Sequence, residues 1–243
     1  MQQYVRKWIF WASVPLLLPQ ALWVRRHAPR FAAPVGAESG KVGVIESTQR
    51  PLRLIGLGDS IIAGVGACHA DECLTAQFAR ELRIRRGVAV EWSNIGRIGA
   101  TTTRVLHELA GKLPDEPADL LLISVGVNDV TTLRRRREWS DEVRALADRL
   151  AAHSPRAVSL FLGLPPMQYF PALPVPLRQS LGLRARLFDE TLRAALAGHP
   201  TAQHVPLAVD PSSDVFSADG FHPSPGAYTL IARALADQIA AAR

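Results

Sequence analysis

The chain has 243 residues, of which 48% are hydrophobic and 21% are charged, with 17 glycines, 18 prolines and two cysteines. This composition excludes a disulfide-built scaffold, a collagen-like repeat and a largely disordered protein, and the length suffices for one substantial core. The formal net charge is +6, but residues 1–30 hold five basic side chains and no acid, which leaves 23 basic and 22 acidic side chains elsewhere. Nucleic-acid binding needs a clustered basic surface. The four arginines at 134–137 are more typical of a solvated turn, so we expect no nucleic-acid partner.

The first predicted element is the uncharged, mostly apolar segment 8–24, which basic residues flank on both sides. Its 17 residues match the lower limit of a bilayer-spanning helix, and tryptophans lie near its ends. We expect residues 1–30 to be an uncleaved membrane anchor. A cleaved secretory signal and a helix packed on the domain are the alternatives, and Arg25 and Arg26 stand where a signal would have small residues. The expected location is therefore membrane-anchored or exported, in the cell envelope. A cytoplasm-facing orientation stays open because both flanks are basic.

Residues 31–50 are rich in Ala, Pro, Gly and Ser and are predicted to be a linker. From residue 51 to 243, short apolar runs alternate with amphipathic segments. Strands are expected over 53–58, 88–96, 119–126, 157–163 and 204–209, and helices over 75–86, 102–113, 138–153, 183–198 and 225–242. This alternation predicts one α/β domain with a five-stranded parallel sheet that is covered on both faces. Ligands of such sheets bind at the carboxyl ends of the strands.

Small, polar, glycine-containing turns follow the first three predicted strands, at 58–60, 94–101 and 126–129, and a similar turn at 219–223 precedes the last helix. A parallel sheet brings these turns to one edge, which is the layout that a nucleophilic hydrolase needs. Ser60 is the candidate nucleophile, in a sharp turn that opens a helix, and His222 is the candidate base. Asp219 lies one helical turn earlier and is expected to orient the imidazole.

A tetrahedral intermediate also needs hydrogen-bond donors directed at its oxyanion. The backbone N–H groups of Ser60 and Gly99 and the side-chain amide of Asn128 are the candidates. Gly99 is suitable because a missing side chain lets the backbone approach a substrate closely. Taken singly, these residues also have structural interpretations: Asp59 and Ser60 as helix caps, Gly99 as a turn residue, Asn128 as an Asx-turn former.

Four sequence blocks, GDSIIAG, NIGRIGATT, GVND and DGFHPS, stand in this order along the chain. Together they resemble the blocks of the SGNH hydrolases, the GDSL-type lipase and esterase family, with Ile61 in place of the usual leucine. The resemblance implies a three-layer α/β/α sandwich of flavodoxin-like type. It also implies Ser60 as nucleophile, Asp219 and His222 as its partners, and Gly99 and Asn128 as oxyanion donors, with no metal or cofactor.

The proline-dense stretch 163–183 follows the fourth strand at the same edge. It is expected to form a wall of the substrate site through Met167, Tyr169, Phe170 and Leu173, with an ordered crossover loop as the alternative. Cys68 and Cys73 are compatible with a local disulfide or two free thiols, and their spacing fits no standard zinc site. The other six histidines have no partner comparable to that of His222.

The sequence therefore predicts a serine ester hydrolase that forms an acyl-enzyme and acts on small-molecule or lipid esters. A thioesterase, a lysophospholipase and a deacetylase of envelope polysaccharide use the same machinery and remain open. A membrane-tethered binding module is the non-enzymatic alternative, which the full set of candidate catalytic residues disfavours.

Overall fold

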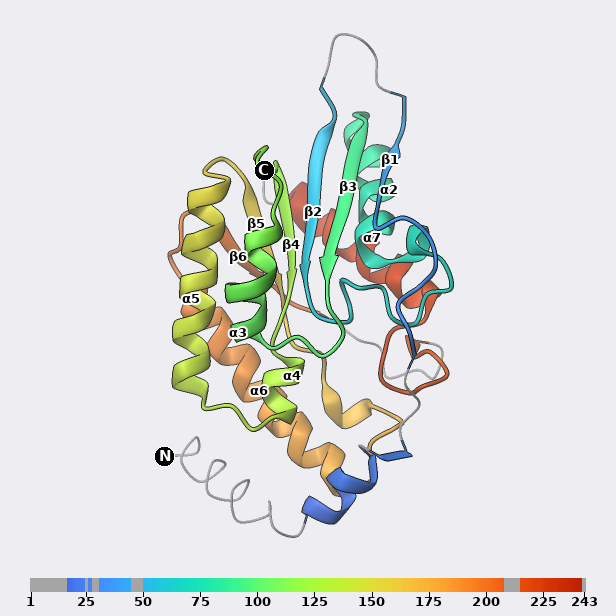
Figure 1. The fold of residues 1–243 in the computed structure, drawn as a ribbon, viewed down its shortest axis with the longest axis vertical. Coiled ribbons are helices and arrows are strands. Elements are labelled where there is room, and N and C mark those ends of the chain that lie inside the picture. Colours follow the sequence, from blue (N-terminus) through green and yellow to red (C-terminus); the bar gives the residue numbers. More distant parts are fainter. Residues whose placement is uncertain (1–16, 25, 28–30, 45–49, 208–214, 242–243) are drawn as a thin grey trace.

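The computed structural model describes residues 17–24, 26–27, 31–44, 50–207 and 215–241. Within them a central sheet lies between two layers of helices (Figure 1). The sheet contains β1 (Ser39–Val42), β2 (Leu52–Gly58), β3 (Val90–Gly96), β4 (Leu120–Ser124), β5 (Val158–Leu162) and β6 (Ala202–Val205), in the spatial order β1-β3-β2-β4-β5-β6. β2 to β6 are mutually parallel, which confirms the predicted parallel sheet and the α/β class.

Two helices cover one face of the sheet, α2 (Leu74–Arg86) and α7 (Pro225–Ala241). The other face carries α3 (Thr102–Arg104), α5 (Arg136–His153) and α6 (Leu177–Leu196), and the short α4 (Val127–Thr131) follows β4 (Figure 1). Each face has its own apolar core, one shared by β-strand side chains with α2 and α7, the other with α5 and α6. All five residues of β4 are buried, as a strand with both faces covered requires.

The sheet has six strands and not the five that the sequence predicted. β1 pairs antiparallel with β3 at the sheet edge, in the register Ser39 to Ser93 and Val42 to Val90. It lies inside the segment 31–50, so the linker prediction is wrong for these residues. β1 is short and lies at the edge of the sheet, with β3 as its neighbour, and half of its side chains face solvent. Such a strand can therefore form without a long run of apolar residues in the sequence.

Two helices also differ from their predicted bounds. The segment 102–113 is helical but irregular: α3 continues into a π-helical turn, Val105–Leu109, and a 3₁₀ turn, Ala110–Lys112. α6 begins at Leu177, six residues before the predicted start, directly after Pro176. Proline is compatible with the start of a helix, where its missing N–H costs no hydrogen bond.

The predicted membrane anchor falls largely outside the described residues, which start within it at Leu17. Residues 17–24 are helical. Leu17 and Val24 are buried in the core, whereas Leu18, Leu22 and Trp23 are each more than half exposed. The Gln20 side chain donates to the carbonyl of Val175 at 3.2 Å and accepts from the N–H of Leu177 at 3.2 Å. No helix within the described ranges is long and apolar enough to cross a bilayer. The function and location of residues 1–30 stay predictions.

Candidate active site

Ser60 lies at the point where the order of the sheet reverses. The chain places β3 on one side of β2 and then crosses to place β4 on the other side. Such a switch point leaves a crevice at the carboxyl ends of the strands. The carbonyl oxygen of Ser124, at the end of β4, would collide with any side chain at Gly58, so only glycine lets β2 and β4 end this close together. The next residues turn sharply, with Val65 N–H donating to the carbonyl of Ser60 at 3.0 Å.

The helix predicted to open at Ser60 is absent, because residues 60–64 form turns and α2 starts only at Leu74. Asp59 Oδ1 instead accepts the N–H of Ile61 at 3.1 Å. This local bond fixes the turn in the way that a short polar side chain often does. The serine is thus held by a compact turn and not by the first turn of a helix.

The side chains of Ser60, His222 and Asp219 form one hydrogen-bonded chain. His222 Nε2 lies 2.9 Å from Ser60 Oγ, and His222 Nδ1 lies 2.6 Å from Asp219 Oδ2. The carboxylate is buried, with 1% of its side chain exposed, whereas 23% of the imidazole is exposed. A buried acid, an oriented imidazole and a hydroxyl in this order are the arrangement in which a serine is activated as a nucleophile.

The loop at 217–223 determines how Asp219 faces His222. Asp219 Oδ1 accepts three hydrogen bonds, from Ser217 Oγ at 2.8 Å, Phe221 N–H at 2.8 Å and His222 N–H at 2.9 Å. The two residues are therefore joined by a turn, and not by the helical turn that the sequence suggested. Burial alone would raise the pKa of Asp219, but these hydrogen bonds and that from the imidazole hold the pKa below its ordinary value. The carboxylate thus stays ionised.

Gly99 and Asn128, the predicted oxyanion donors, lie in adjoining loops. Asn128 lines the same cavity as Ser60 and His222. Its amide donates one hydrogen to the carbonyl of Ala100 at 2.9 Å, which ties α4 to the loop that carries Gly99. Gly99 has a φ of +75°, a conformation that favours glycine, and open space lies where a side chain would be. A second amide hydrogen of Asn128 is left for a ligand.

A buried polar network holds these two loops together, and sequence reasoning missed it. Asp129 Oδ2 accepts the backbone N–H of Thr102 at 3.0 Å and its hydroxyl at 2.9 Å. The same hydroxyl accepts the indole N–H of Trp139 at 2.7 Å. Asp129 directly follows Asn128 and Thr102 directly follows the Gly99–Thr101 loop, so this network ties together the two segments that carry the candidate donors. The only indication of this network in the sequence was that Asp129 directly follows Asn128.

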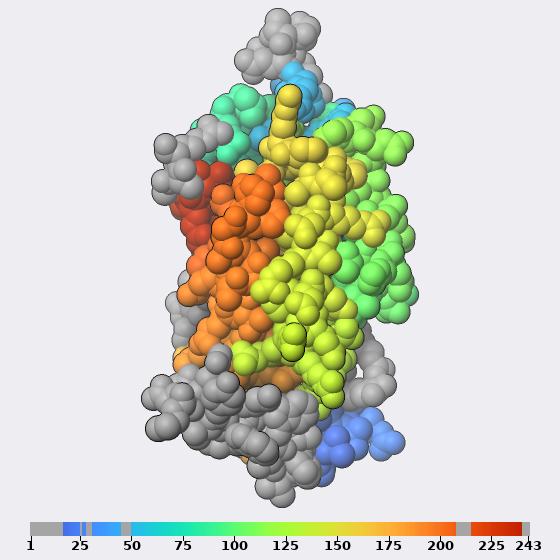
Figure 2. Space-filling model, turned by 90° about the vertical axis from the view of Figure 1, so that its left-hand side faces the viewer, coloured from blue at the N-terminus to red at the C-terminus, as the bar shows by residue number. Residues whose placement is uncertain are grey.

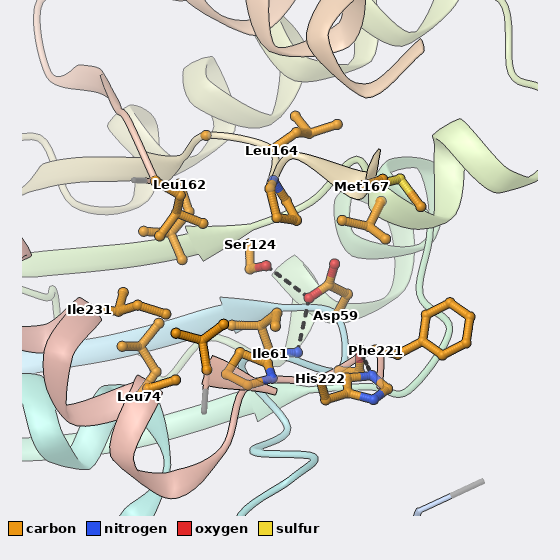
Figure 3. Close-up of a pocket in the computed structure, with 18 of the residues that line it drawn as sticks. Asp59, Ile61, Leu74, Ser124, Leu162, Leu164, Met167, Phe221, His222 and Ile231 are labelled. Atoms are coloured by element: carbon orange, nitrogen blue, oxygen red, sulfur yellow. Dashed lines mark hydrogen bonds between the residues drawn. The ribbon is translucent and has the colours of Figure 1, made fainter. Parts of the chain in front are cut away.

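Asp59 is the second residue that sequence reasoning missed. It is 1% exposed and accepts the hydroxyl of Ser124 at 2.8 Å (Figure 3). Burial raises the pKa of Asp59 to about 6, although the hydrogen bonds from Ser124 and Ile61 and the nearby His222 act in the opposite direction. The sequence offered only a helix cap for this residue, since nothing local reveals that its side chain is buried at the cavity and bonded to Ser124.

We expect the Asp59→Asn variant to lose part of the pH dependence of folding stability. A carboxyl whose pKa is higher in the folded state, about 6 against 3.8, stabilises fully below pH 3.8, and this contribution is lost as the pH rises through 6. Two pKa units correspond to about 3 kcal/mol. At pH 5 about half of this contribution remains, and at pH 8 almost none. Urea unfolding at pH 5 and pH 8 should therefore show a decrease in the free energy of unfolding that is about 1.4 kcal/mol smaller in Asp59→Asn than in the wild type. Identical decreases in both proteins, or the same change in the exposed control Asp115→Asn, would contradict this expectation.

A cavity of about 380 Å³ opens next to Ser60 and His222 (Figure 3). Of the predicted wall residues, Met167 and Phe170 line it. Phe170 makes edge-to-face contacts with Phe216 and Phe221, which line it as well. Tyr169 is 45% exposed and Leu173 is buried in the core, and neither is among the described residues that line the cavity. Two of the four predicted wall residues thus line the cavity, and their contact with a substrate stays a prediction.

The remaining candidate groups do not form a second site among the described residues. Cys68 is exposed and Cys73 is buried, and both are free thiols, with Cys73 accepting a hydrogen bond from Asn94. No group of three or more His, Cys, Asp and Glu residues in the described ranges could hold a metal ion. His204 does have a carboxylate partner, contrary to expectation: its Nε2 lies 2.7 Å from Asp189, which also accepts the N–H of Leu164. This pair supports the cavity wall.

The order of the strands defines a protein of the three-layer α/β/α class, and the hydrogen-bonded chain of Ser60, His222 and Asp219 at its switch point has the arrangement found in serine hydrolases. The family model of the GDSL-like lipase/acylhydrolase family matches residues 57–230. The chain belongs to this family and is a hydrolase that acts on ester bonds.

Individual relatives agree with this assignment. The chain is 29% identical over 233 residues to a GDSL-like esterase of Mycobacterium tuberculosis, with 89% of this chain and 73% of the relative covered. It shares its fold with a carbohydrate esterase family 2 enzyme of Corynascus thermopiles (Myceliophthora fergusii), at a TM-score of 0.63 and 18% identity, covering 82% of this chain and 68% of that one. The esterase EstA of Pseudoalteromonas sp. is similar at a TM-score of 0.60 and 18% identity, with 78% and 97% covered.

Proposed function

We propose that the protein hydrolyses carboxylic esters through an acyl-enzyme, with Ser60 as nucleophile, His222 as general acid and base, and Asp219 as the residue that orients His222. The observation that carries the proposal is the unbroken hydrogen-bonded chain from Ser60 Oγ through the imidazole to Asp219 Oδ2. Its distances of 2.9 and 2.6 Å lie within the range that proton transfer requires.

In the first half-reaction, Ser60 Oγ attacks the ester carbonyl carbon while His222 Nε2 takes the hydroxyl proton. The tetrahedral intermediate collapses, the bond to the alcohol oxygen breaks, and Nε2 returns the proton to that oxygen. In the second half-reaction, water attacks the acyl carbon, Nε2 takes a proton from the water, and the proton then returns to Ser60 Oγ as the acid leaves. Asp219, held ionised by its hydrogen bonds, stabilises the imidazolium that forms in both halves.

The oxyanion of each tetrahedral intermediate would be bound by the N–H groups of Ser60 and Gly99 and by the free amide hydrogen of Asn128. The shared bond between Asn128 and the carbonyl of Ala100 supports this role, because it keeps the donors fixed relative to each other before the substrate arrives. Donors that need no reorganisation stabilise a developing charge far more strongly than mobile ones, and each typically contributes about 10²–10³ in rate.

The same groups would act on a thioester, on a lysophospholipid or on acetylated envelope polysaccharide, because all three present an acyl carbonyl to Ser60. No observation at the catalytic groups themselves favours one of them. A chain that only binds such a ligand would not need the proton path from Ser60 to Asp219, so the enzymatic proposal is the stronger one.

The proposal is tested with the full chain and a phosphonate ester that reacts with activated serine hydroxyls. We expect one phosphonyl group per molecule, located on Ser60 by peptide mass analysis, and loss of p-nitrophenyl butyrate hydrolysis in proportion to labelling. His222→Ala should slow the labelling by at least about 100-fold, because the hydroxyl loses its base. Labelling at another serine, or full activity after complete labelling of Ser60, would refute the proposal.

A further inference from the structure

We infer that the cavity beside Ser60 continues as an apolar groove along α7 that binds the acyl chain of the substrate, and that the preferred acyl group is long, with about a dozen carbons. This inference rests on the proposed function and specifies its substrate. The groove is defined by the α7 residues Ala227, Leu230, Ile231, Ala234, Leu235 and Gln238 together with the strand ends opposite them.

One wall of the groove is a single face of α7. Relative to Ala227, the other five lining residues stand at positions +3, +4, +7, +8 and +11, so the side chains form one stripe along the helix. The opposite wall comes mainly from Leu162, the last residue of β5, and from Pro206 and Leu207, which directly follow β6. The other face of α7 packs against α2, where Tyr228 and Ala232 are fully buried. α7 therefore packs against α2, and the groove lies between α7 and the strand ends.

The groove starts at the catalytic residues. His222 and Pro223 line its beginning, five and four residues before Ala227. Figure 3 shows Leu74, Leu162 and Ile231 on one side of Asp59, and Met167 and Phe221 on the other. The site thus has two apolar sides, one along α7 for the acyl chain and one near Met167 and Phe221 for the alcohol part.

The length of the groove gives the length of the acyl chain. Ala227 and Gln238 are 11 residues apart on α7. At about 1.5 Å per residue, the stripe spans about 16 Å, the extended length of an acyl chain of about a dozen carbons. Ala234 and Gln238 are exposed, so the far half of the groove is open at its edge, and a chain there would be partly covered.

The lining indicates a hydrocarbon ligand and not a sugar. Apart from the catalytic end, its described residues are almost all aliphatic or aromatic, and none is Lys or Arg. Oligosaccharides need several polar groups that replace the water on their hydroxyls, and an unpaired hydroxyl in such a groove would be unfavourable. The exposed leucine at the edge, Leu230 with 59% of its surface accessible, also fits a surface that a ligand covers.

The test is a chain-length series of p-nitrophenyl esters from acetyl to hexadecanoyl, each kept below the concentration at which it forms micelles. Each buried CH₂ is expected to raise kcat/KM about twofold in a half-open groove, so the dodecanoyl ester should exceed the acetyl ester by at least about 100-fold. Ala234→Trp places an indole across the groove about 10 Å from Ala227. It should lower kcat/KM for the dodecanoyl ester by at least about 10-fold and leave the butyryl ester within about twofold.

Ala145→Trp is the matched control, because Ala145 is an exposed alanine on α5, on the other face of the sheet. It should change neither ester. The groove assignment would be overturned if kcat/KM of the wild type were highest for the acetyl ester, or if Ala234→Trp slowed all esters equally. In either case, hydrolysis of the butyryl ester that depends on Ser60 would still support the proposed function. Absence of any ester hydrolysis that depends on Ser60 would instead refute the proposed function.

Discussion

The Ser60→Ala variant is expected to lose ester hydrolysis by a factor of about 10⁴ to 10⁶ in kcat. No other hydroxyl is joined to His222 within the described part of the chain, so the imidazole would have no nucleophile to activate. The remaining oxyanion donors and the cavity would still bind substrate, so KM should change little. Steady-state kinetics with p-nitrophenyl butyrate would measure both quantities.

Ser60 is held by a turn and its removal leaves no cavity larger than one oxygen atom, so the variant should fold normally. Ser39→Ala, an exposed serine on the edge strand β1, is the matched control and should retain full activity. Thermal unfolding of all three proteins would separate loss of chemistry from loss of fold. A Ser60→Ala protein with more than about a tenth of wild-type turnover would rule out Ser60 as the nucleophile.

The Asp219→Asn variant is expected to lose about 10³ to 10⁴ in kcat, for a reason that the hydrogen bonds make specific. Asp219 Oδ1 accepts from Ser217, Phe221 and His222 N–H, so only an oxygen can occupy that position. The asparagine NH₂ would then face His222 Nδ1 and donate to it. The imidazole would carry its proton on Nε2, where it could no longer accept the proton of Ser60.

A comparison of Asp219→Asn with Asp219→Ala separates the effect of the imidazole tautomer from the effect of the lost carboxylate charge. Asp219→Ala removes the carboxylate but leaves the tautomer free, so it should retain more activity than Asp219→Asn. Asp115→Asn, at an exposed position, should behave as the wild type. If Asp219→Asn retained wild-type kcat, the proposed tautomer control by Asp219 would be wrong, and His222 would be acting without a carboxylate partner.

The parallel sheet and the proximity of Ser60, His222 and Asp219 could be predicted because their signals are local. A continuous apolar run such as 120–124 indicates a strand buried on both faces, and a polar turn after each strand indicates the functional edge. Ser60, His222 and Asp219 follow from these turns. The edge strand β1 could not be predicted, because an exposed four-residue strand has no distinct periodicity and gains its stability from pairing with β3.

Parts of the site that depend on tertiary packing were also beyond the sequence. The burial of Asp59 and the Asp129–Thr102–Trp139 network depend on which side chains face the interior after β2 and β4 come together. The groove along α7 depends on the helix packing against α2 rather than fully against the strands. An amphipathic pattern in 225–242 predicts a helix with an apolar face, but it does not reveal that part of this face is left for a ligand.

The two hydrogen bonds of the Gln20 side chain matter for experiments with truncated forms of the protein. Its side chain bridges residues 175 and 177, at the end of the same loop that brings Met167 and Phe170 to the cavity. Removing the N-terminal helix would leave a carbonyl and an amide without their partners where α6 begins, and would uncover the apolar surface beneath Leu17 and Val24. Substrate specificity measured on a truncated chain would then reflect an altered cavity wall near Met167 and Phe170. Substrate specificity should therefore be measured on a chain that includes the N-terminal helix.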